Sequence, residues 1–302
     1  MGLTEKTFRD GEIIIKEGDN GTSFFRLLEG NAGVYAGFGK NDQIKLAVLN
    51  AGEYFGEMAI LEAYPRSATV VAKGSARVVE IPGDELKAYF TANPDQIIEL
   101  MRYLGNRVQT MTKDYNDSKL LLDELRQSDA TKKDSLFSKI KKHIDVYQSN
   151  KNKLAEPDTS SLKEELEKIK GNNTGNIKAY NKGIFIFREG DFATSMYILH
   201  SGEVGLYTNY RHKDELKINS YSAVAVFGEM GMIAEEPRNA TAVADSENVR
   251  AEIINQEDLE KIFLACPAKI EFILRHLSYQ LRRLTIDFLN VCKEITETYN
   301  KK

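Results

Sequence analysis

Residues 55–72 read FGEMAILEAYPRSATVVA, and residues 227–244 read FGEMGMIAEEPRNATAVA. Ten of the eighteen positions are identical, and the two copies begin 172 residues apart. Each copy has a glutamate at its third position and an arginine at its twelfth, among small and apolar neighbours. Because this pair of opposite charges recurs at the same spacing, it indicates an internal repeat in which the glutamate and the arginine have the same role in both halves of the chain.

The duplication extends well beyond these two segments. In each half, short runs rich in β-branched and aromatic residues alternate with glycine turns, which is typical of hairpin-connected strands. Many short strands at this spacing predict an antiparallel barrel or jelly roll, with turns at Gly30 and Gly202. The matched runs are EIIIKEGD (12–19) and GIFIFREGD (183–191), SFFRLLEGNAGVYAG (23–37) and SMYILHSGEVGLYTN (195–209), KLAVLNAGEYFGEM (45–58) and KINSYSAVAVFGEM (217–230), and ARVVEIPGDEL (76–86) and VRAEIINQEDL (249–259).

A long helical segment follows each predicted barrel. Its apolar residues recur at alternating steps of four and three, a heptad pattern that predicts a coiled-coil seam. The alternative is a helix packed only on its own barrel, but about 30 residues at about 1.5 Å each span about 45 Å, which exceeds a small barrel. The seam positions are Ile97, Met101, Leu104, Val108, Met111, Tyr115, Ser118, Leu122 and Leu125 in the first half, and Ile270, Leu274, Leu277, Leu281, Leu284, Phe288, Val291 and Ile295 in the second.

The sequence therefore predicts a mainly β fold with α-helices, in which two barrel-like domains each precede a long C-terminal helix. The expected divisions are a first domain at 1–125, a helical and charged linker at 126–176, and a second domain at 177–302. Within the linker, the apolar spacing predicts an amphipathic helix. Its apolar face would carry Leu136, Ile140, Ile144 and Tyr147.

Composition excludes several classes of protein. The net charge of −4 and the pI near 5.8 do not draw the chain to nucleic acid or to anionic membranes. No apolar run approaches the roughly 18 residues of a membrane span, and no signal peptide is visible at the start. Cys266 and Cys292 fit no metal or redox spacing, so we expect buried thiols in a reducing compartment, the cytoplasm. The scattered histidines predict no metal site.

The chemistry of the repeated segment favours an anionic ligand. A glycine followed by glutamate and an apolar run is typical of the first turn of a short helix, whose free N–H groups attract anions. Arg66 and Arg238 suit bidentate binding of a phosphate. Glu57 and Glu229 would repel a phosphate but accept a hydrogen bond from a sugar hydroxyl. The alternative is a structural ion pair between the two charges of each copy, which would add little stability. The wall that follows is kept small by Ala68, Thr69, Ala240 and Thr241.

Each half resembles a cyclic nucleotide-binding domain, and GEMAILEAYPRSATV (56–70) is similar to the phosphate-binding cassette of that family. The resemblance covers about residues 5–125 and 177–298. It implies a β-roll fold and a cyclic nucleotide ligand, with cAMP ahead of cGMP and no other cofactor. By this resemblance the ribose 2′-hydroxyl is held by Glu57 and Glu229, and the cyclic phosphate is paired with Arg66 and Arg238. Further ligand contacts are implied for the N–H groups of Gly56, Glu57, Met58, Gly228, Glu229 and Met230, and for the positions after each arginine, Ser67, Ala68, Asn239 and Ala240.

The two long helices resemble the dimerisation helix of the bacterial catabolite activator family. The matching stretches are NPDQIIELMRYLGNRVQTMT (93–112) and CPAKIEFILRHLSYQLRRLT (266–285). In that family a hydroxyl side chain on the helix of the opposite subunit reads the adenine amino group, which implies this role for Thr112 and Thr285. We therefore expect an internal pseudo-dimer in which Thr285 serves the first site and Thr112 serves the second.

The expected function is a non-enzymatic sensor that passes a cyclic nucleotide signal to a separate protein, as a monomer with an internal pseudo-two-fold or as a homo-oligomer. Tandem domains also resemble the regulatory subunit of cAMP-dependent protein kinase. No kinase glycine-rich loop or cyclase signature is visible, and the sequence ends after the second helix without a helix-turn-helix, so DNA binding is not expected. The alternatives are an interaction protein that has lost its ligand and a DNA-binding regulator. The second copy lacks the glycine at the position of Gly52, which predicts unequal sites.

Overall fold

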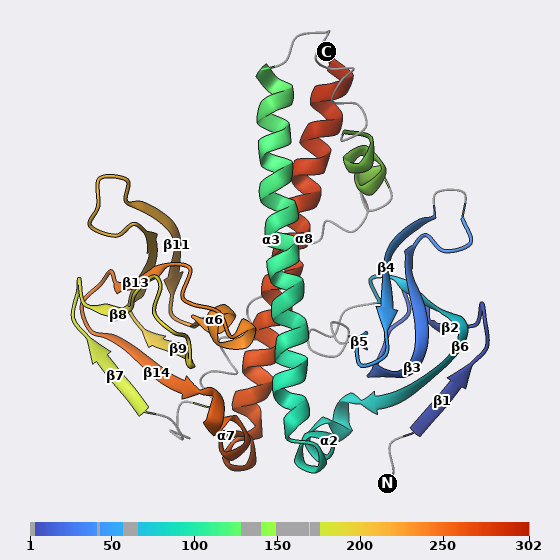
Figure 1. The fold of residues 1–302 in the computed structure, drawn as a ribbon, viewed down its shortest axis with the longest axis horizontal. Helices are drawn as coiled ribbons and strands as arrows, with labels where there is room; N and C mark the ends of the chain where they lie inside the picture. Colours follow the sequence, from blue (N-terminus) through green and yellow to red (C-terminus); the bar gives the residue numbers. More distant parts are fainter. Residues whose placement is uncertain are drawn as a thin grey trace. The chain divides into compact units, whose positions relative to one another are not determined.

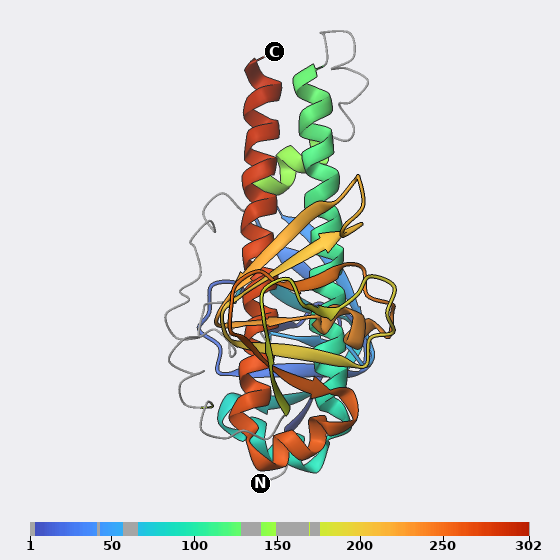
Figure 2. The same ribbon diagram turned by 90° about the vertical axis from the view of Figure 1, so that its left-hand side faces the viewer.

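The computed structural model describes residues 4–40, 43–56, 66–127, 140–148, 169 and 176–301 (Figures 1 and 2). Its contacts divide the chain into two compact units. The first comprises Met1–Tyr89, Arg107–Pro157 and Ser278–Lys302, and the second comprises Phe90–Asn106 and Asp158–Leu277. Each unit combines one β-roll with segments of both long helices, α3 (Asp95–Gln127) and α8 (Pro267–Lys301). The division at 1–125, 126–176 and 177–302 follows the sequence repeat instead and stays a prediction.

The first unit contains a six-stranded antiparallel sheet. Its two longest strands, β3 and β6, lie side by side (Figure 1), and the strand order is β1-β6-β3-β4, with β2 paired to β6 and β5 to β3. Aromatic and β-branched residues fill these strands, as expected for a half-buried pleated surface. The strands are β1 (Thr4–Phe8), β2 (Ile13–Ile15), β3 (Ser23–Ala36), β4 (Ile44–Asn50), β5 (Tyr54–Phe55) and β6 (Thr69–Pro82).

Gly30 bends β3 without ending it. Its φ is +81°, and the register between β3 and β6 shifts between Leu27 and Glu29 and again between Glu29 and Asn31. A Cβ atom here would also collide with the carbonyl oxygen of Ser75, so glycine is required twice over. The predicted turn is therefore a bulge within one strand of the first roll. In the second roll the chain does break at Gly202, between β9 (Ser195–Ser201) and β10 (Glu203–Thr208).

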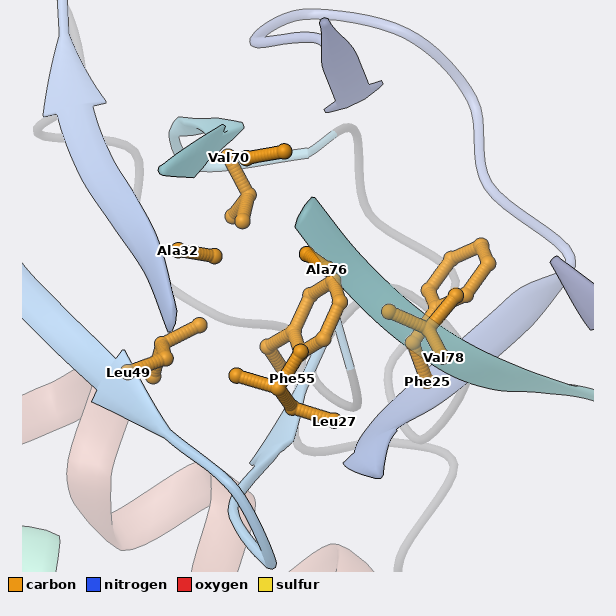
Figure 3. Packing of buried hydrophobic residues seen from close by; sticks show 9 residues of the cluster. Phe25, Leu27, Ala32, Leu49, Phe55, Val70, Ala76 and Val78 are labelled. Carbon is orange, nitrogen blue, oxygen red and sulfur yellow. The ribbon is translucent and has the colours of Figure 1, made fainter. Parts of the chain in front are cut away.

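The interior of the first roll is apolar and tightly filled. Side chains from β3, β4, β5 and β6 gather there (Figure 3), and the rings of Phe25 and Phe55 stack with centroids 5.3 Å apart. Fully burying one such side chain contributes about 1.5–3 kcal/mol. The cluster consists of Phe25, Leu27, Ala32, Leu49, Phe55, Val70, Ala72, Ala76 and Val78.

The second unit holds two four-stranded sheets in the orders β11-β10-β13-β8 and β12-β9-β14-β7. A core of the same character lies inside, where Tyr197 stacks on Phe227 at 5.1 Å. The remaining elements are β7 (Asn176–Tyr180), β8 (Phe185–Phe187), β11 (Leu216–Ser222), β12 (Ala225–Phe227), α6 (Glu229–Ala234), β13 (Thr241–Ala244), β14 (Val249–Asn255) and α7 (Leu259–Ala265). The predicted fold of two β-rolls, each followed by a long helix, is confirmed.

Three helical segments meet in one apolar cluster of the first unit. The later parts of α3 and α8 run side by side in both ribbon views, and residues 140–148 form a further helix beside them (Figures 1 and 2). Ser118, the polar seam position, contacts His143 of that helix at 2.9 Å. The cluster contains Leu121, Leu122, Leu125, Ile140, Val291 and Ile295, with Tyr115, Ile144 and Tyr299 at its margin. The apolar face through Ile140 and Ile144 is confirmed, whereas the coiled-coil pairing stays a prediction and Leu136 lies outside the described residues.

Candidate functional site

The guanidinium of Arg66 is held by two backbone carbonyls of the first roll. Nη1 donates to the oxygen of Gly56 at 2.5 Å, and Nη2 donates to the oxygen of Ser23. The ring of Phe25 lies 5.8 Å from the same guanidinium, and the side chain is 7% exposed. The arginine is therefore fixed from the strand that precedes the cassette and from the start of β3.

Arg238 repeats this arrangement in the second roll. Nη1 donates to Gly228 and Nη2 donates to Ser195 at 2.6 Å, and these partners match Gly56 and Ser23 at the 172-residue offset. The guanidinium lies 4.2 Å from the ring centre of Phe187. Carbonyls and an aromatic face orient a cation without neutralising its charge.

Backbone hydrogen bonds fasten each arginine to the Glu-Gly-Asp turn that follows the second strand of its roll. The turn donates to the arginine carbonyl and accepts from the arginine N–H, so the arginine cannot move independently of it. The four bonds run from Gly18 to Arg66 (2.9 Å), from Arg66 to Asp19 (2.8 Å), from Gly190 to Arg238 (2.8 Å) and from Arg238 to Asp191 (2.8 Å).

Thr69 and Thr241 connect the same turn to the strand that leaves the cassette. Each hydroxyl accepts a hydrogen bond from a backbone N–H, at 3.0 Å from Glu17 and at 3.0 Å from Glu189. The Glu17 carboxylate accepts in turn from the N–H of Gly37 at 2.8 Å. This role of the two threonines was not predicted from the sequence, although the Glu-Gly-Asp triplet repeated before both cassettes could have indicated it.

The second cassette contains the predicted short helix, α6. Gly228 precedes it in the left-handed conformation, with φ of +71°, and Glu229 is its first residue. The Glu229 side chain is 3% exposed. The carboxylate that we expect to face a ribose is therefore a buried group. Met230 is half-buried on the same helix, and Glu57 and Met58 of the first copy lie outside the described residues.

The residues after each arginine divide into a buried and an exposed position. Ala68 and Ala240 are buried, at 8% and 1% exposure, whereas Ser67 and Asn239 are exposed. A difference exists before the cassette, where Gly52 has φ of +96° in the first roll. In the second roll the matching position is Val224, and the peptide bond between Ala223 and Val224 is cis.

Arg238 and Glu229 do not form the structural ion pair considered above. Within the described residues no carboxylate approaches the Arg238 guanidinium within 4.0 Å, and its buried Nε has no hydrogen-bond partner there. Burial lowers the pKa of Arg238, although Tyr197 and Glu229 oppose that shift. An arginine keeps its charge even so. A buried cation with an unused donor is a favourable seat for an anion.

Thr112 and Thr285 occupy matched positions on the two long helices. Each hydroxyl donates to a carbonyl one turn earlier in its own helix, Thr112 to Val108 at 2.8 Å and Thr285 to Leu281 at 2.8 Å. Their hydrogens are therefore committed, and only the oxygen lone pairs remain for a ligand.

Two helices contact the second cassette within the second unit, which the sequence did not predict. Arg102 of α3 donates through Nε to the Ile233 carbonyl at 3.3 Å and through Nη2 to Glu235 at 2.7 Å. On α8, the imidazole of His276 is hydrogen-bonded to the backbone of Val226, two residues before Gly228. Arg102 thus contacts the last turn and the C-cap of α6, and His276 contacts the strand that precedes this helix.

A match to known families accompanies this geometry. The family described as the cyclic nucleotide-binding domain matches residues 5–93 and 177–266. The chain belongs to this family. A cGMP-dependent protein kinase from Plasmodium berghei is 25% identical over 319 aligned positions, which cover 81% of this chain and 36% of the relative. The chain thus spans about a third of that relative's length.

Two solved structures are also similar to the chain. The cAMP-bound PfPKA-R is 19% identical with a TM-score of 0.36, and 88% of this chain and 74% of that chain are covered. The regulatory domain of Toxoplasma gondii PKA with cAMP is 18% identical with a TM-score of 0.28, and 89% and 82% are covered. No helix in the described ranges has the length and apolar character needed to cross a membrane.

Proposed function

We propose that this chain is a non-enzymatic sensor that binds a cyclic nucleotide in each of its two cassettes and signals to a separate protein. The observation that carries the proposal is the buried guanidinium of Arg238, which is oriented by two carbonyls and an aromatic ring and whose buried Nε–H has no hydrogen-bond partner among the described residues. The equivalent hold on Arg66 extends the proposal to the first roll. Glu57 and Glu229 accept from the ribose hydroxyl in this scheme.

The committed hydroxyls of Thr112 and Thr285 support cAMP over cGMP. A hydroxyl that donates within its own helix offers its lone pairs to a ligand, which favours the amino group of adenine over the carbonyl oxygen that guanine carries at the same ring position. In the pseudo-dimer that we propose, Thr285 serves the first site and Thr112 the second. The variants Thr112→Ala and Thr285→Ala should each weaken cAMP binding more than cGMP binding, and an equal effect on both nucleotides would contradict this assignment.

Signalling would proceed through the anchors of α6. A phosphate bound at Arg238 interacts with the first turn of α6, while Arg102 and His276 connect the flanks of that helix to α3 and α8. A ligand shifts a conformational equilibrium only by its differential affinity for the two states. We infer that the bound and free cassettes differ in these anchors, and that the partner protein reads the resulting position of the long helices.

Calorimetric titration with cAMP and cGMP tests the proposal directly, and native mass spectrometry reports how many sites fill and the oligomeric state. Arg238→Gln and Arg66→Gln should each weaken binding at one site by about thirtyfold or more, because a partner of a buried charged contact is lost. Arg250→Gln, at an exposed arginine of the second roll, is the matched control and should leave affinity unchanged.

The other outcomes identify the competing functions. No binding of either nucleotide by the wild-type protein would favour an interaction protein that has lost its ligand, and salt-dependent DNA binding would favour a DNA-binding regulator.

The buried thiols Cys266 and Cys292 agree with the reducing compartment that we propose, the cytoplasm.

A further inference from the structure

A closed polar cluster lies on the outer face of the second roll. The hydroxyl of Tyr207 donates its one hydrogen to the Asp245 carboxylate, whose two oxygens lie 2.9 and 3.0 Å from it, and Asp245 also pairs with Lys217 at 2.7 Å. A Cβ atom at Gly205 would collide with both Asp245 and Tyr207. Glycine at that position therefore makes room for the carboxylate. The negative charge of Asp245 and the positive charge of Lys217 balance each other within the cluster.

The first roll has a matching group of residues, the Lys45–Lys73 seat, which lacks the carboxylate. At the 172-residue offset, Tyr35, Lys45 and Gly33 repeat the tyrosine, lysine and glycine, but Lys73 stands where the second roll has Asp245. The Tyr35 ring lies across Gly33 as Tyr207 lies across Gly205, because a Cβ at either glycine would stand 2.5 Å from the ring Cε2. The geometry of the seat is thus preserved while its anion is replaced by a second cation.

Two lysines consequently meet at this seat, and the residues that the structure describes place no acid beside them. Lys73 lowers the pKa of Lys45 through hydrogen bonding and charge repulsion, and within the described residues neither ammonium has a carboxylate within 4.0 Å. Tyr35 and Lys45 are direct partners in the register of β3 and β4. Two ammonium groups and a phenol at one place form a site for an external anion.

The surroundings of this seat favour a protein segment over a free anion. Among the described strands, β4 ends the sheet on its side, so its outer backbone edge is available to an added strand. Leu46 and Val48 on β4 are 46% and 39% exposed. The register of β3 and β4 shifts between Val34 and Tyr35, so Leu46 lies at a bulge, while Val48 opposite Gly33 and Lys45 opposite Tyr35 share one face. An added strand that carries both acidic and apolar side chains would meet Lys45 and Val48 on this face.

We propose that the Lys45–Lys73 seat and the adjoining edge of β4 bind an extended segment of a partner protein, with one acidic side chain taking the position that Asp245 fills in the second roll. This surface uses neither cassette, so it is independent of nucleotide binding. The second roll has the same kind of edge strand in β11, but its seat is already closed by its own carboxylate.

The probe is a fluorescein-labelled, end-blocked hexapeptide that carries glutamate and valine on the same face, titrated against the full chain at low salt and followed by anisotropy. Wild-type protein should bind it, and hydrogen exchange should show new protection at residues 44–50. Lys73→Asp, which rebuilds the closed cluster, should weaken binding at least tenfold, and Lys73→Met should weaken it less. Asp245→Lys opens the second seat and should add a second binding event.

Two controls distinguish specific binding of the peptide from misfolding of a variant and from a non-specific effect of anions. Far-UV circular dichroism and unchanged cAMP titration establish that each variant is folded. Equal binding by wild type and Lys73→Asp overturns the proposal, as does the absence of binding by wild-type protein. Displacement of the peptide by an equal concentration of inorganic phosphate also overturns it, because the seat would then be a general anion site.

Discussion

His276 should make the second unit sensitive to mild acid. Its side chain is 7% exposed on α8, and burial lowers the pKa of this histidine to about 4, although a hydrogen bond with the backbone of Val226 opposes the shift. The ordinary value is 6.5. Between these two pH values the unfolded chain carries a proton that the folded chain excludes, so the free energy of unfolding falls as the pH falls.

The pKa difference of His276 sets the size of this loss. With a folded pKa of about 4 and an unfolded pKa of 6.5, acidification from about pH 7 to about pH 5 removes about 2 kcal/mol of stability. The full effect, reached below about pH 4, is about 3 kcal/mol. Because Val226 directly precedes Phe227 and Gly228, the loss should loosen the approach to the second cassette first.

Urea unfolding at pH 7, 6 and 5 measures this effect, with far-UV circular dichroism as the signal and His276→Gln as the comparison. The glutamine keeps a hydrogen-bond donor but does not titrate, so its stability should change about 2 kcal/mol less than that of wild type over this range. Other titrating groups occur in both proteins and cancel in the difference. Parallel pH profiles for the two proteins would refute the assignment, and hydrogen exchange at 225–234 locates the change.

Three further perturbations test individual contacts of the second unit. Lys269→Met should destabilise the protein by about 3–5 kcal/mol, because it leaves the buried Glu252 carboxylate without the ammonium that lies 2.6 Å away. In chemical denaturation, the double variant Lys269→Met/Glu252→Gln should recover most of this loss of stability. No recovery would mean that the lost packing of Lys269, and not the unpaired charge of Glu252, causes the loss. Thr241→Val should cost about 1–3 kcal/mol by leaving the Glu189 N–H without its acceptor, with Thr241→Ser as the control that retains the hydroxyl in a thermal-melt comparison. Arg102→Ala should cost about 1 kcal/mol or less in overall stability but increase hydrogen exchange at 229–235, and unchanged exchange there would remove Arg102 from the signalling scheme.

The candidate site was accessible from the sequence because its chemistry is concentrated in a short, repeated segment. Arg66, Arg238 and Glu229 were predicted as ligand contacts from residue type, spacing and family resemblance, and their recurrence in one frame supports that prediction. Their supports were not accessible in the same way, since Ser23 lies 43 residues from Arg66 and Glu17 lies 52 residues from Thr69. Hydrogen-bond partners at such separations are brought together only when the strands pair.

The partners that balance the charge of a buried side chain could also be identified only in the folded chain. Glu80 on β6 and Glu252 on β14 lie one position apart when the two rolls are aligned, and Glu80 pairs with Lys6 while Glu252 is enclosed by His200 and Lys269. Burial alone would raise the pKa of Glu252, but the hydrogen bonds from His200 and Lys269 outweigh it and the pKa is lowered. A residue's type and position give its charge, but only its neighbours decide whether that charge is neutralised.

The order of residues is enough to predict the duplication, the two β-rolls, the long helices and the arginine and glutamate of each cassette, because strand alternation, heptad spacing and repeated chemistry are local properties. The tertiary structure alone decided which surfaces cover one another. It placed a helix at 140–148 in the cluster with α3 and α8, set Arg102 against the end of α6, and brought Lys73 of β6 beside Lys45 of β4. Periodicity shows that a face is apolar or charged, but the element that meets that face depends on contacts between residues far apart in the chain.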